Sequence, residues 1–331
     1  MPKAWVVREL GSPDGLRFED IDGTALPDGL VRIRVQASAV NFFDLLQIAG
    51  LYQVKPDLPF VPGAEVAGEV EAAPSSSGLR PGDRVLAMVA QDGLHRGGYA
   101  EVTHADPDGV LKIPDSMSFV EAAAFFINYQ TGWFGLHRRA NLQPGEVVLV
   151  HGGAGGVGTA AIQLAKAAGA RVVATAGSET KVAVCRAMGA DVAINYKEED
   201  FVALVKEATD GRGADVIYDP VGGDVFDRST KCIAFEGRIV VVGFTSGRMP
   251  SVAANHVLIK NYSVVGLHWG LYRQRAPQLI AQCTEELLRL YEAGKIRPHV
   301  GQQAPLAEAV ALLQAVAARQ TTGKAVLTVT S

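Results

Sequence analysis

The sequence predicts an α/β protein with two domains, a doubly wound parallel sheet and a β-rich domain of barrel type. Two observations predict this fold class. Through the middle of the chain, apolar strand-like runs alternate with helical patterns, which is typical of a parallel sheet with helices on both faces. Before Phe119 the chain instead carries short β-like runs broken by proline and glycine, with little helical pattern. This second pattern indicates a twisted antiparallel domain.

The β-rich region is expected to form short strands separated by turns. Apolar runs bounded by turn residues predict strands at 31–35, 65–70, 84–89 and 99–102. The first eight residues also have the pattern of a strand, and they lack the long apolar core of a signal peptide.

The alternating region begins at an apolar strand, 147–150. Strands are predicted at 147–150, 171–176, 192–195, 216–219, 238–244 and 262–267, and helices at 159–169, 180–188, 200–209 and 224–234. Further helices at 276–293 and 306–318 and a last strand at 324–329 should return the chain to the first domain. The expected domains are therefore 1–127 with 271–331, and 128–270.

A glycine-rich turn joins the first strand of the alternating region to its helix. Gly153, Gly155 and Gly158 have the G-x-G-x-x-G spacing of a dinucleotide-binding βα unit. The first glycine permits a tight turn, the second lets a pyrophosphate approach the backbone, and the third lets the helix pack closely. The N–H groups at the start of the helix, at Gly156 and Val157, would point at the phosphates.

Composition excludes several classes of function. Hydrophobic residues make up 48% of the 331 residues and charged residues 20%, as in ordinary globular proteins. The net charge of −4 gives no electrostatic basis for binding nucleic acid. No apolar run reaches the roughly 20 residues that a membrane span needs. Cys185, Cys232 and Cys283 lie far apart, so we expect reduced thiols in a cytoplasmic protein.

Five motifs carry a family resemblance that extends over the whole chain. They are Asn41-Phe-Phe-Asp44-Leu-Leu-Gln-Ile-Ala-Gly50-Leu-Tyr52, Pro62-Gly-Ala-Glu65-Val-Ala-Gly68, Pro81-Gly-Asp83-Arg84-Val85, Gly97-Gly-Tyr99-Ala-Glu101 and Gly323-Lys324-Ala-Val-Leu327. The chain resembles the medium-chain dehydrogenase/reductase superfamily, and most closely its NADPH:quinone oxidoreductases of the ζ-crystallin type. The resemblance implies a GroES-like catalytic domain and a Rossmann domain that binds NADP(H).

The resemblance also implies that no metal is bound. Zinc alcohol dehydrogenases of this superfamily have a cysteine where this chain has Asn41 and a histidine in the segment that holds Ala64. Their third ligand would lie near Ile127 and Asn128. A catalytic zinc needs three N, S or O ligands from the protein. The chain has no C-x-x-C and its seven histidines are scattered, so we interpret it as zinc-free.

The second strand of the alternating region indicates which nicotinamide cofactor is used. An NAD site usually has an acidic residue at this strand end, which would repel a 2′-phosphate. Here Gly177 and Ser178 leave room for the phosphate, and the resemblance implies that Lys181 and Tyr196 bind it. Glu179 would favour the ribose 2′-hydroxyl of NADH instead. Alternatively, Glu179 occupies the first turn of the next helix, where its carboxylate complements the helix dipole. NADPH is the expected cofactor. How strongly the protein prefers NADPH to NADH stays open.

The resemblance assigns catalytic roles to Tyr52 and Asn41. Tyr52 would donate a hydrogen bond or a proton to the substrate. Asn41 would contact the nicotinamide end or order a water, since a neutral amide cannot act as a base. Asp44 is expected to fix its loop. Further cofactor-binding residues are expected at Thr131, Gly243, Phe244, Thr245 and Lys324.

Three functions remain open. The first is a reductase of quinones or α,β-unsaturated carbonyls, whose conjugation spreads the developing charge so that no Lewis acid is needed. The second is a 2-enoyl thioester reductase, because Ile48 is similar to the residue of enoyl reductases where many quinone reductases carry arginine. The third is a non-catalytic NADPH-binding protein. The partners we expect are a small-molecule substrate and a second copy, paired through the β-prone segment 262–267; a tetramer remains an alternative.

Overall fold

The computed structural model describes residues 1–22 and 29–329, and it divides into two compact units. Unit 1 is Met1–Phe126 with His299–Ser331, and unit 2 is Ile127–Pro298. The tail of the chain from His299 onward groups with the first 126 residues. Residues 330 and 331, which end the expected first domain, lie outside the described residues.

The boundary at the tail differs from the expected one, because residues 271–298 group with unit 2. Hydrogen bonds within unit 2 account for this. Gln130 Nε2 donates to Ile280 O at 3.2 Å and to Thr284 Oγ1 at 2.8 Å. Gln163 Nε2 donates to Arg297 O at 3.0 Å.

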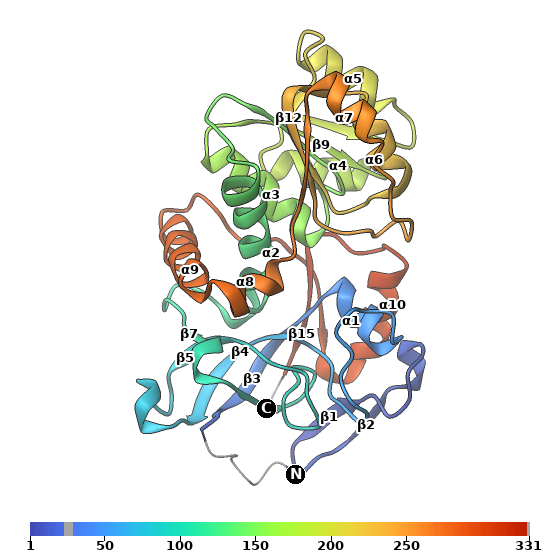
Figure 1. Ribbon diagram of the computed structural model, residues 1–331. Helices are drawn as coiled ribbons and strands as arrows, with labels where there is room; N and C mark the ends of the chain where they lie inside the picture. Colours follow the sequence, from blue (N-terminus) through green and yellow to red (C-terminus); the bar gives the residue numbers. More distant parts are fainter. Residues whose placement is uncertain (23–28, 330–331) are drawn as a thin grey trace. The chain divides into compact units, whose positions relative to one another are not determined.

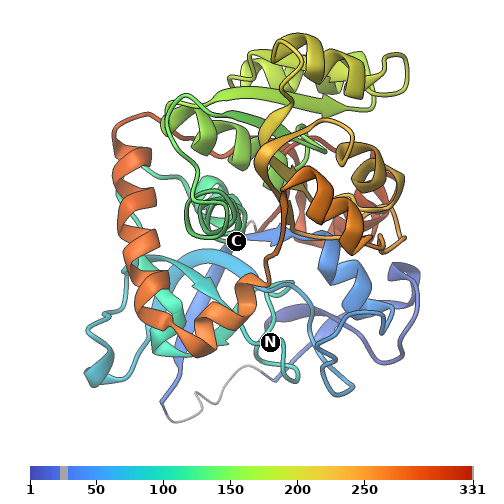
Figure 2. The ribbon, with the colours of Figure 1, turned by 45° about the horizontal axis from the view of Figure 1, so that its top comes forward.

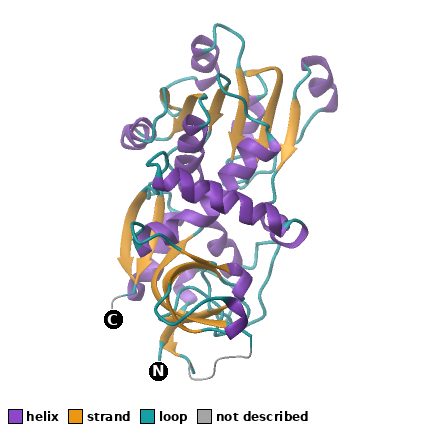
Figure 3. Cartoon of the chain, turned by 90° about the vertical axis from the view of Figure 1, so that its left-hand side faces the viewer, coloured by secondary structure: helices purple, strands orange, loops and turns teal. Residues whose placement is uncertain are grey.

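Unit 1 is built around one mainly antiparallel sheet, in the order β14-β15-β3-β4-β5-β7 with β6 also paired to β3, and a separate β1–β2 ribbon (Figure 3). Its strands are β1 (Lys3–Val6), β2 (Arg17–Asp20), β3 (Val31–Val40), β4 (Glu65–Ala72), β5 (Arg84–Met88), β6 (Val102–Ala105), β7 (Val110–Lys112), β14 (Val300–Pro305) and β15 (Lys324–Thr328). Its helices are α1 (Phe42–Ile48), α10 (Ala309–Ala317) and the short η1 (Pro13–Gly15), η2 (Ser75–Ser77), η3 (Pro107–Gly109) and η5 (Leu306–Glu308).

The central strand of unit 1 is β3, which pairs with strands from both ends of the chain. Its inward residues Val31, Ile33 and Val35 are fully or almost fully buried. On one side β4 pairs with it, and on the other β15 pairs antiparallel, with Ala325 opposite Val40. This register brings the start of β15 to the end of β3.

Unit 2 contains a parallel sheet in the order β10-β9-β8-β11-β12-β13 (Figure 1). Its strands are β8 (Val147–Val150), β9 (Arg171–Ala176), β10 (Val192–Asn195), β11 (Ala214–Asp219), β12 (Ile233–Val241) and β13 (Ser263–Gly266). In order of the chain this is 3-2-1-4-5-6, the doubly wound order expected from the alternating pattern. All four residues of β8 are buried, as is typical of an inner parallel strand.

Helices connect the strands of this sheet, and Figure 2 shows them beside it. The connecting helices are α3 (Gly156–Ala167), α4 (Glu179–Ala187), α5 (Phe201–Ala208), α6 (Gly223–Ser229) and α7 (Ala254–Lys260). Two further helices of unit 2, α8 (Trp269–Arg275) and α9 (Pro277–Glu292), follow β13, the last strand of the sheet. The helix α2 (Phe119–Trp133) begins in unit 1 and ends in unit 2, where the π-helix η4 (Phe134–Arg139) continues it. Within the described residues, no helix has the length and apolar character required to span a membrane.

Several predicted boundaries were wrong. The strand expected at 99–102 begins at Val102, because Ala100 makes only an isolated bridge to Ala4. The helix expected at 224–234 ends at Ser229, and Ile233 already belongs to β12. The strand β14 and the helices α1 and α8 were not predicted.

Candidate functional site

The residues predicted for the site lie in two groups, one in each unit. Unit 2 holds the predicted dinucleotide residues, namely Thr131, Gly153, Gly155, Gly156, Val157, Gly158, Gly177, Ser178, Lys181, Tyr196, Gly243, Phe244 and Thr245. Unit 1 holds Asn41, Tyr52 and Lys324.

The glycine turn has the geometry that its spacing predicts. A Cβ on Gly158 would lie 2.2 Å from Gly152 O, and one on Gly153 would lie 2.8 Å from Cys185 Sγ. These two glycines therefore allow close packing. At Gly155 the nearest atom to an added Cβ is Gly152 O at 3.3 Å, so the outer side of the turn is open. Gly152, which the motif does not include, has a φ of +59° and makes the turn possible.

The open side of this turn is the start of α3. Gly155 is the N-cap of α3 and makes no side-chain capping bond. The first N–H groups of any helix lack partners within the helix, and the helix dipole makes this end positive. The turn is therefore suited to a phosphate.

Residues at the end of β9 form a second polar cluster. Ser178 is the N-cap of α4, and its Oγ accepts a hydrogen bond from Lys181 N at 3.4 Å. A Cβ on Gly177 would lie 2.7 Å from the hydroxyl of Tyr196. Glu179 is the first residue of α4, and its Oε1 accepts from Asn195 Nδ2 at 3.4 Å. Its carboxylate thus has a helix-dipole partner and a hydrogen bond.

The Gly243-Phe244-Thr245 turn lies at the carboxyl end of the sheet, beside the end of β11. Thr245 N and Oγ1 both donate to Pro220 O at 3.1 Å. Asp219 Oδ1 accepts from Val221 N and Gly222 N at 2.8 and 2.9 Å. Sequence reasoning missed Asp219: its Oδ2 is buried without a hydrogen-bond partner among the described residues, and burial raises the pKa of this carboxyl.

A buried histidine lies directly before the glycine turn. His151 Nε2 is 2.8 Å from Ser229 Oγ, and Nδ1 is 2.9 Å from Thr175 Oγ1. Ser229 donates its proton to Val225 O, so it must accept from the Nε2–H of the histidine. Both ring nitrogens are therefore satisfied in the neutral form. Burial, with a smaller contribution from the charge of Arg228, lowers the pKa of His151 to about 3.

This histidine should make the protein sensitive to acid. Its folded pKa lies below the unfolded value of about 6.5, so stability is lost as the pH falls below 6.5. Between pH 7 and pH 5 the loss from His151 should be about 2 kcal/mol in the free energy of unfolding. His151→Gln can keep both hydrogen bonds but does not titrate. Urea unfolding at the two pH values should give a smaller pH dependence for this variant, and an equal dependence would contradict the assignment.

In unit 1, Asp44 holds the segment that carries Asn41. Its carboxylate is fully buried and accepts from Asn41 N at 2.8 Å, Tyr99 Oη at 2.9 Å and Gln91 Nε2 at 3.4 Å. Burial raises the pKa of Asp44 to about 6, although these hydrogen bonds and the charge of Lys324 lower it. The contacts agree with the expectation that Asp44 fixes its loop.

Asn41 itself is held through its side chain by a lysine. The Lys324 ammonium donates to Asn41 Oδ1 and lies 3.3 Å from Glu65 Oε2. The side chains of Lys324 and Glu65 are 5% and 0% exposed. Asn41 Nδ2 is buried and has no hydrogen-bond partner among the described residues. A buried donor without a partner costs about 1–3 kcal/mol, so this atom is a candidate ligand contact.

Tyr52 lies after α1 and stacks on Phe43, with ring centroids 5.4 Å apart. The side chain is partly buried. Burial, and then the charge of Asp44, raises the pKa of the Tyr52 phenol. The phenol therefore stays protonated at neutral pH and can donate one hydrogen bond.

Two positions of unit 1 match zinc-ligand positions of related dehydrogenases, namely Asn41 and Ala64. Ala64 contributes no ligand atom, and the ammonium of Lys324 occupies Asn41 Oδ1. In the ranges 1–22 and 29–329, no three His, Cys, Asp or Glu side chains gather as metal ligands would.

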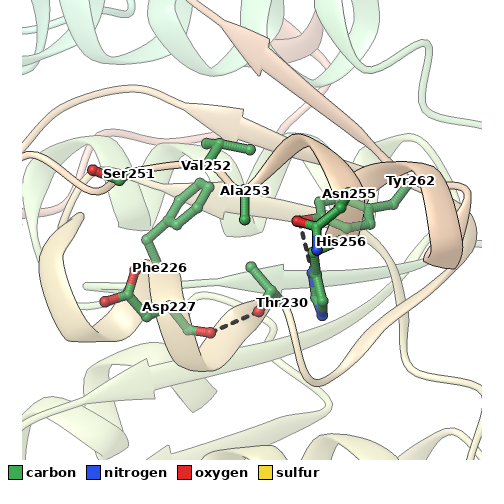
Figure 4. A pocket seen from close by; sticks show the side chains of 9 residues that line it. All are labelled: Phe226, Asp227, Thr230, Ser251, Val252, Ala253, Asn255, His256 and Tyr262. Atoms are coloured by element: carbon green, nitrogen blue, oxygen red, sulfur yellow. Dashed lines mark hydrogen bonds between the residues drawn. The ribbon is translucent and has the colours of Figure 1, made fainter.

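Unit 2 also has a surface hollow of about 310 Å³, and none of the residues predicted for cofactor binding or catalysis line it. It lies between α6 and α7, and Figure 4 shows Phe226 and Tyr262 at its sides with the hydrogen bond between Tyr262 and His256. The predicted chemistry does not involve this hollow.

Sequence reasoning missed three residues that organise the site. Glu65 lies in one of the family motifs, but that motif does not mark it as the partner of Lys324, and no motif contains Gln91. Asp219 ends a predicted strand, and only its position at the carboxyl edge of a parallel sheet could have indicated it.

Both units are similar to known protein families. A family model described as the alcohol dehydrogenase GroES-like domain matches residues 27–115, and one described as zinc-binding dehydrogenase matches residues 156–285. A quinone oxidoreductase-like protein 2 homolog from Nematostella vectensis is 41% identical and covers 98% of this chain and 88% of its own length.

Solved structures of reductases are also similar to this chain over almost its whole length. Escherichia coli quinone oxidoreductase complexed with NADPH has a TM-score of 0.89 at 31% identity, covering 98% of this chain and 99% of that one. The CurK enoyl reductase has a TM-score of 0.87 at 28% identity, covering 99% of both chains.

Proposed function

The chain belongs to the quinone oxidoreductase family of the medium-chain dehydrogenase/reductase superfamily, and from this membership we propose that it uses NADPH to reduce a quinone or another α,β-unsaturated carbonyl. The observation that carries the proposal is the contact of Lys324 with Asn41, which puts an ammonium on the residue that stands where zinc alcohol dehydrogenases of the superfamily have a ligand cysteine. Beside it, Asn41 Nδ2 and the Tyr52 phenol are donors suited to a substrate oxygen.

NADPH fits the residues of unit 2. The open glycine turn at Gly155 and the start of α3 would hold the pyrophosphate. The cluster of Ser178, Lys181 and Tyr196 would hold the 2′-phosphate, and the hydrogen bond from Asn195 to Glu179 engages the nearby carboxylate. Thr131 and the turn 243–245 would border the nicotinamide. When bound, NADPH supplies a hydride.

Zinc does not fit the residues of unit 1, although one matching family model is described as zinc-binding dehydrogenase. A divalent cation at Asn41 Oδ1 would lie beside the ammonium of Lys324, and like charges at this separation repel strongly in a buried site. Ala64 offers only carbon. A conjugated acceptor suits such a site, because its charge spreads over several atoms and hydrogen bonds can stabilise it.

A panel of acceptors tests the proposal. NADPH oxidation is measured with benzoquinone, phenanthrenequinone, a simple enone, crotonyl-CoA and a saturated ketone. We expect turnover with the quinones and the enone and none with the ketone. Equal turnover of the saturated ketone, or no turnover with any conjugated acceptor, would contradict the proposal.

Removal of metal should leave the activity unchanged. Because Lys324 occupies the oxygen that a metal would need, we expect full quinone turnover after dialysis against 1,10-phenanthroline. Elemental analysis of the purified protein should find far less than one zinc per chain. Stoichiometric zinc that leaves together with the activity would show the assignment to be wrong.

A 2-enoyl thioester reductase is the second candidate, favoured by the likeness to the CurK enoyl reductase. The support expected from Ile48 is weak, since its side chain is 1% exposed and packs in the core of unit 1. Ile48 is thus not available to a substrate. A non-catalytic role in NADPH binding is less favoured, because such a protein needs neither Tyr52 nor the buried donor of Asn41.

We further propose a cytoplasmic homodimer. All three cysteines are buried and unpaired, as suits a reducing compartment. On the outer side of the edge strand β13, the backbone groups of Val264 face away from β12. Leu267 N donates inward to Val241 O, so Gly266 faces outward, and Arg139 Nε already donates to Gly266 O at 3.0 Å. Leu258 and Ile259 on the preceding helix are 77% and 75% exposed.

Val264 should therefore be the centre of pairing between two copies. Val264→Pro removes an outward N–H without breaking a bond to β12, and edge strands tolerate proline. We expect wild type and the control Val264→Thr to be dimers at micromolar concentration by light scattering, and Val264→Pro to be a monomer. A wild-type monomer would contradict the proposal.

A further inference from the structure

The ion pair between Lys324 and Glu65 in unit 1 is buried, and its burial needs an explanation beyond stability. Lys324 is the first residue of β15 and Glu65 the first residue of β4, on either side of β3. Both side chains are almost completely buried. Burying an ion pair costs desolvation energy, and apolar residues of similar volume often stabilise a protein as well or better. Stability alone therefore does not account for the pair.

The chemistry of the two partners fixes the orientation of Asn41. A lysine ammonium has donors and no acceptor, so the amide atom that faces it must be Oδ1. Nδ2 then faces the other way, as a donor. The carboxylate of Asp44, which lies on the same segment, accepts instead from Asn41 N, Tyr99 and Gln91. Nothing among the described residues accepts from Nδ2.

The positive charge also changes the strength of that donor. Hydrogen bonds in a chain polarise one another, and the effect is larger in a buried site. An ammonium on Oδ1 withdraws electron density through the amide and makes its N–H groups better donors. Glu65 compensates the charge of Lys324, so the site gains a strong donor without a net positive charge.

Resting on the function proposed above, we infer that Lys324 and Glu65 are positioning residues, which hold Asn41 as the N–H donor to the substrate oxygen that becomes negative during reduction. Hydride transfer brings two electrons and one hydrogen to the conjugated acceptor, with NADP⁺ as the other product. The acceptor becomes an enolate or a hydroquinone monoanion and takes one proton from water. Lys324, expected from the sequence to bind the cofactor, acts on the substrate through Asn41.

Paired substitutions separate positioning from folding. Lys324→Met alone removes a cation from the buried carboxylate of Glu65 and can unfold the protein. The double variant Lys324→Met/Glu65→Gln is neutral and similar in volume. We expect it to melt close to wild type and to bind NADPH within about threefold, with quinone kcat lowered at least about tenfold. Arg34→Met/Glu69→Gln changes a solvent-exposed pair between β3 and β4 and should behave as wild type.

A second experiment replaces Asn41 itself. Asn41→Ala removes the donor itself, so it should lower quinone kcat at least as much as Lys324→Met/Glu65→Gln does, by about tenfold or more. In that background the Lys324→Met/Glu65→Gln change should have no further effect on kcat, because its action passes through Asn41. An undiminished effect there, or wild-type kcat in the double variant, would overturn the inference. A large rise in the NADPH dissociation constant would show that the donor binds the cofactor instead.

A spectroscopic measurement keeps this inference separate from the proposed function. The chain has six asparagines, and selective ¹⁵N labelling with Asn41→Ala as reference identifies the Asn41 amide signal. Lys324→Met/Glu65→Gln should shift this signal, whereas Arg34→Met/Glu69→Gln should not. If wild type reduces no quinone or enone, the proposed function fails, and an unshifted signal still overturns the positioning role of Lys324.

Discussion

Lys181→Ala is expected to raise the KM for NADPH by about 10- to 100-fold and to leave the KM for NADH nearly unchanged. A charge-assisted contact with a phosphate is worth about 1.5–3 kcal/mol, and each 1.4 kcal/mol corresponds to a factor of ten. Lys181 lies one turn into α4, beside Ser178 and within the cluster completed by Tyr196. NADH lacks the 2′-phosphate, so it loses nothing when the lysine is removed.

A second lysine of the same unit provides the control. Lys166 on α3 pairs with Asp191 at 2.9 Å on the surface, and Lys166→Ala should leave both KM values unchanged. Equal increases for NADPH and NADH in Lys181→Ala would remove the assignment of the 2′-phosphate site.

Tyr52→Phe should separate the two enzymatic functions. After hydride arrival an enoyl thioester is an enolate that a positioned phenol can stabilise or protonate, and loss of such a donor costs about 10²–10³ in kcat. A quinone becomes a delocalised hydroquinone anion that water can protonate. For a quinone reductase we therefore expect a loss of no more than about tenfold, or 1.4 kcal/mol.

The substitution is well controlled, because phenylalanine keeps the stack of residue 52 on Phe43 and removes only the hydroxyl. NADPH affinity should not change. A loss of a hundredfold or more with quinones would contradict the expectation and make Tyr52 essential to either chemistry. If crotonyl-CoA is a good substrate of wild type and alone shows the large loss, the enoyl thioester reductase replaces the quinone reductase.

The sequence predicted the parallel sheet of unit 2 well, because local signals determine it. The strands at 171–176 and 192–195 have the predicted bounds, since their apolar runs are short and end at turn residues. The glycine turn is also local: its motif specifies backbone approach at Gly153, Gly155 and Gly158, and the contacts of an added Cβ agree at the first and third.

Features that depend on distant partners could not be predicted. The strand β14 has the sequence Val-Gly-Gln-Gln-Ala-Pro, which lacks an apolar alternation, and its pairing with β15 makes it a strand. The end of α6 was placed too late because nothing local marks the start of β12 at Ile233. The contact between Lys324 and Asn41 requires two strands to be aligned, and no spacing in the sequence encodes that register.

The pairing of β3 with β15 has a consequence for the order in which the protein can be made. Asn41 and Lys324 are 283 positions apart, whereas unit 2 is one continuous segment. Domains fold as units during synthesis, and contacts between distant positions form late. On the ribosome, the glycine turn and its sheet can therefore form while β3 has β4 and β6 as neighbours but still lacks β15. Asn41 acquires its ammonium only when β15 has emerged, so a chain that stops before Gly323 would leave Glu65 buried opposite no cation.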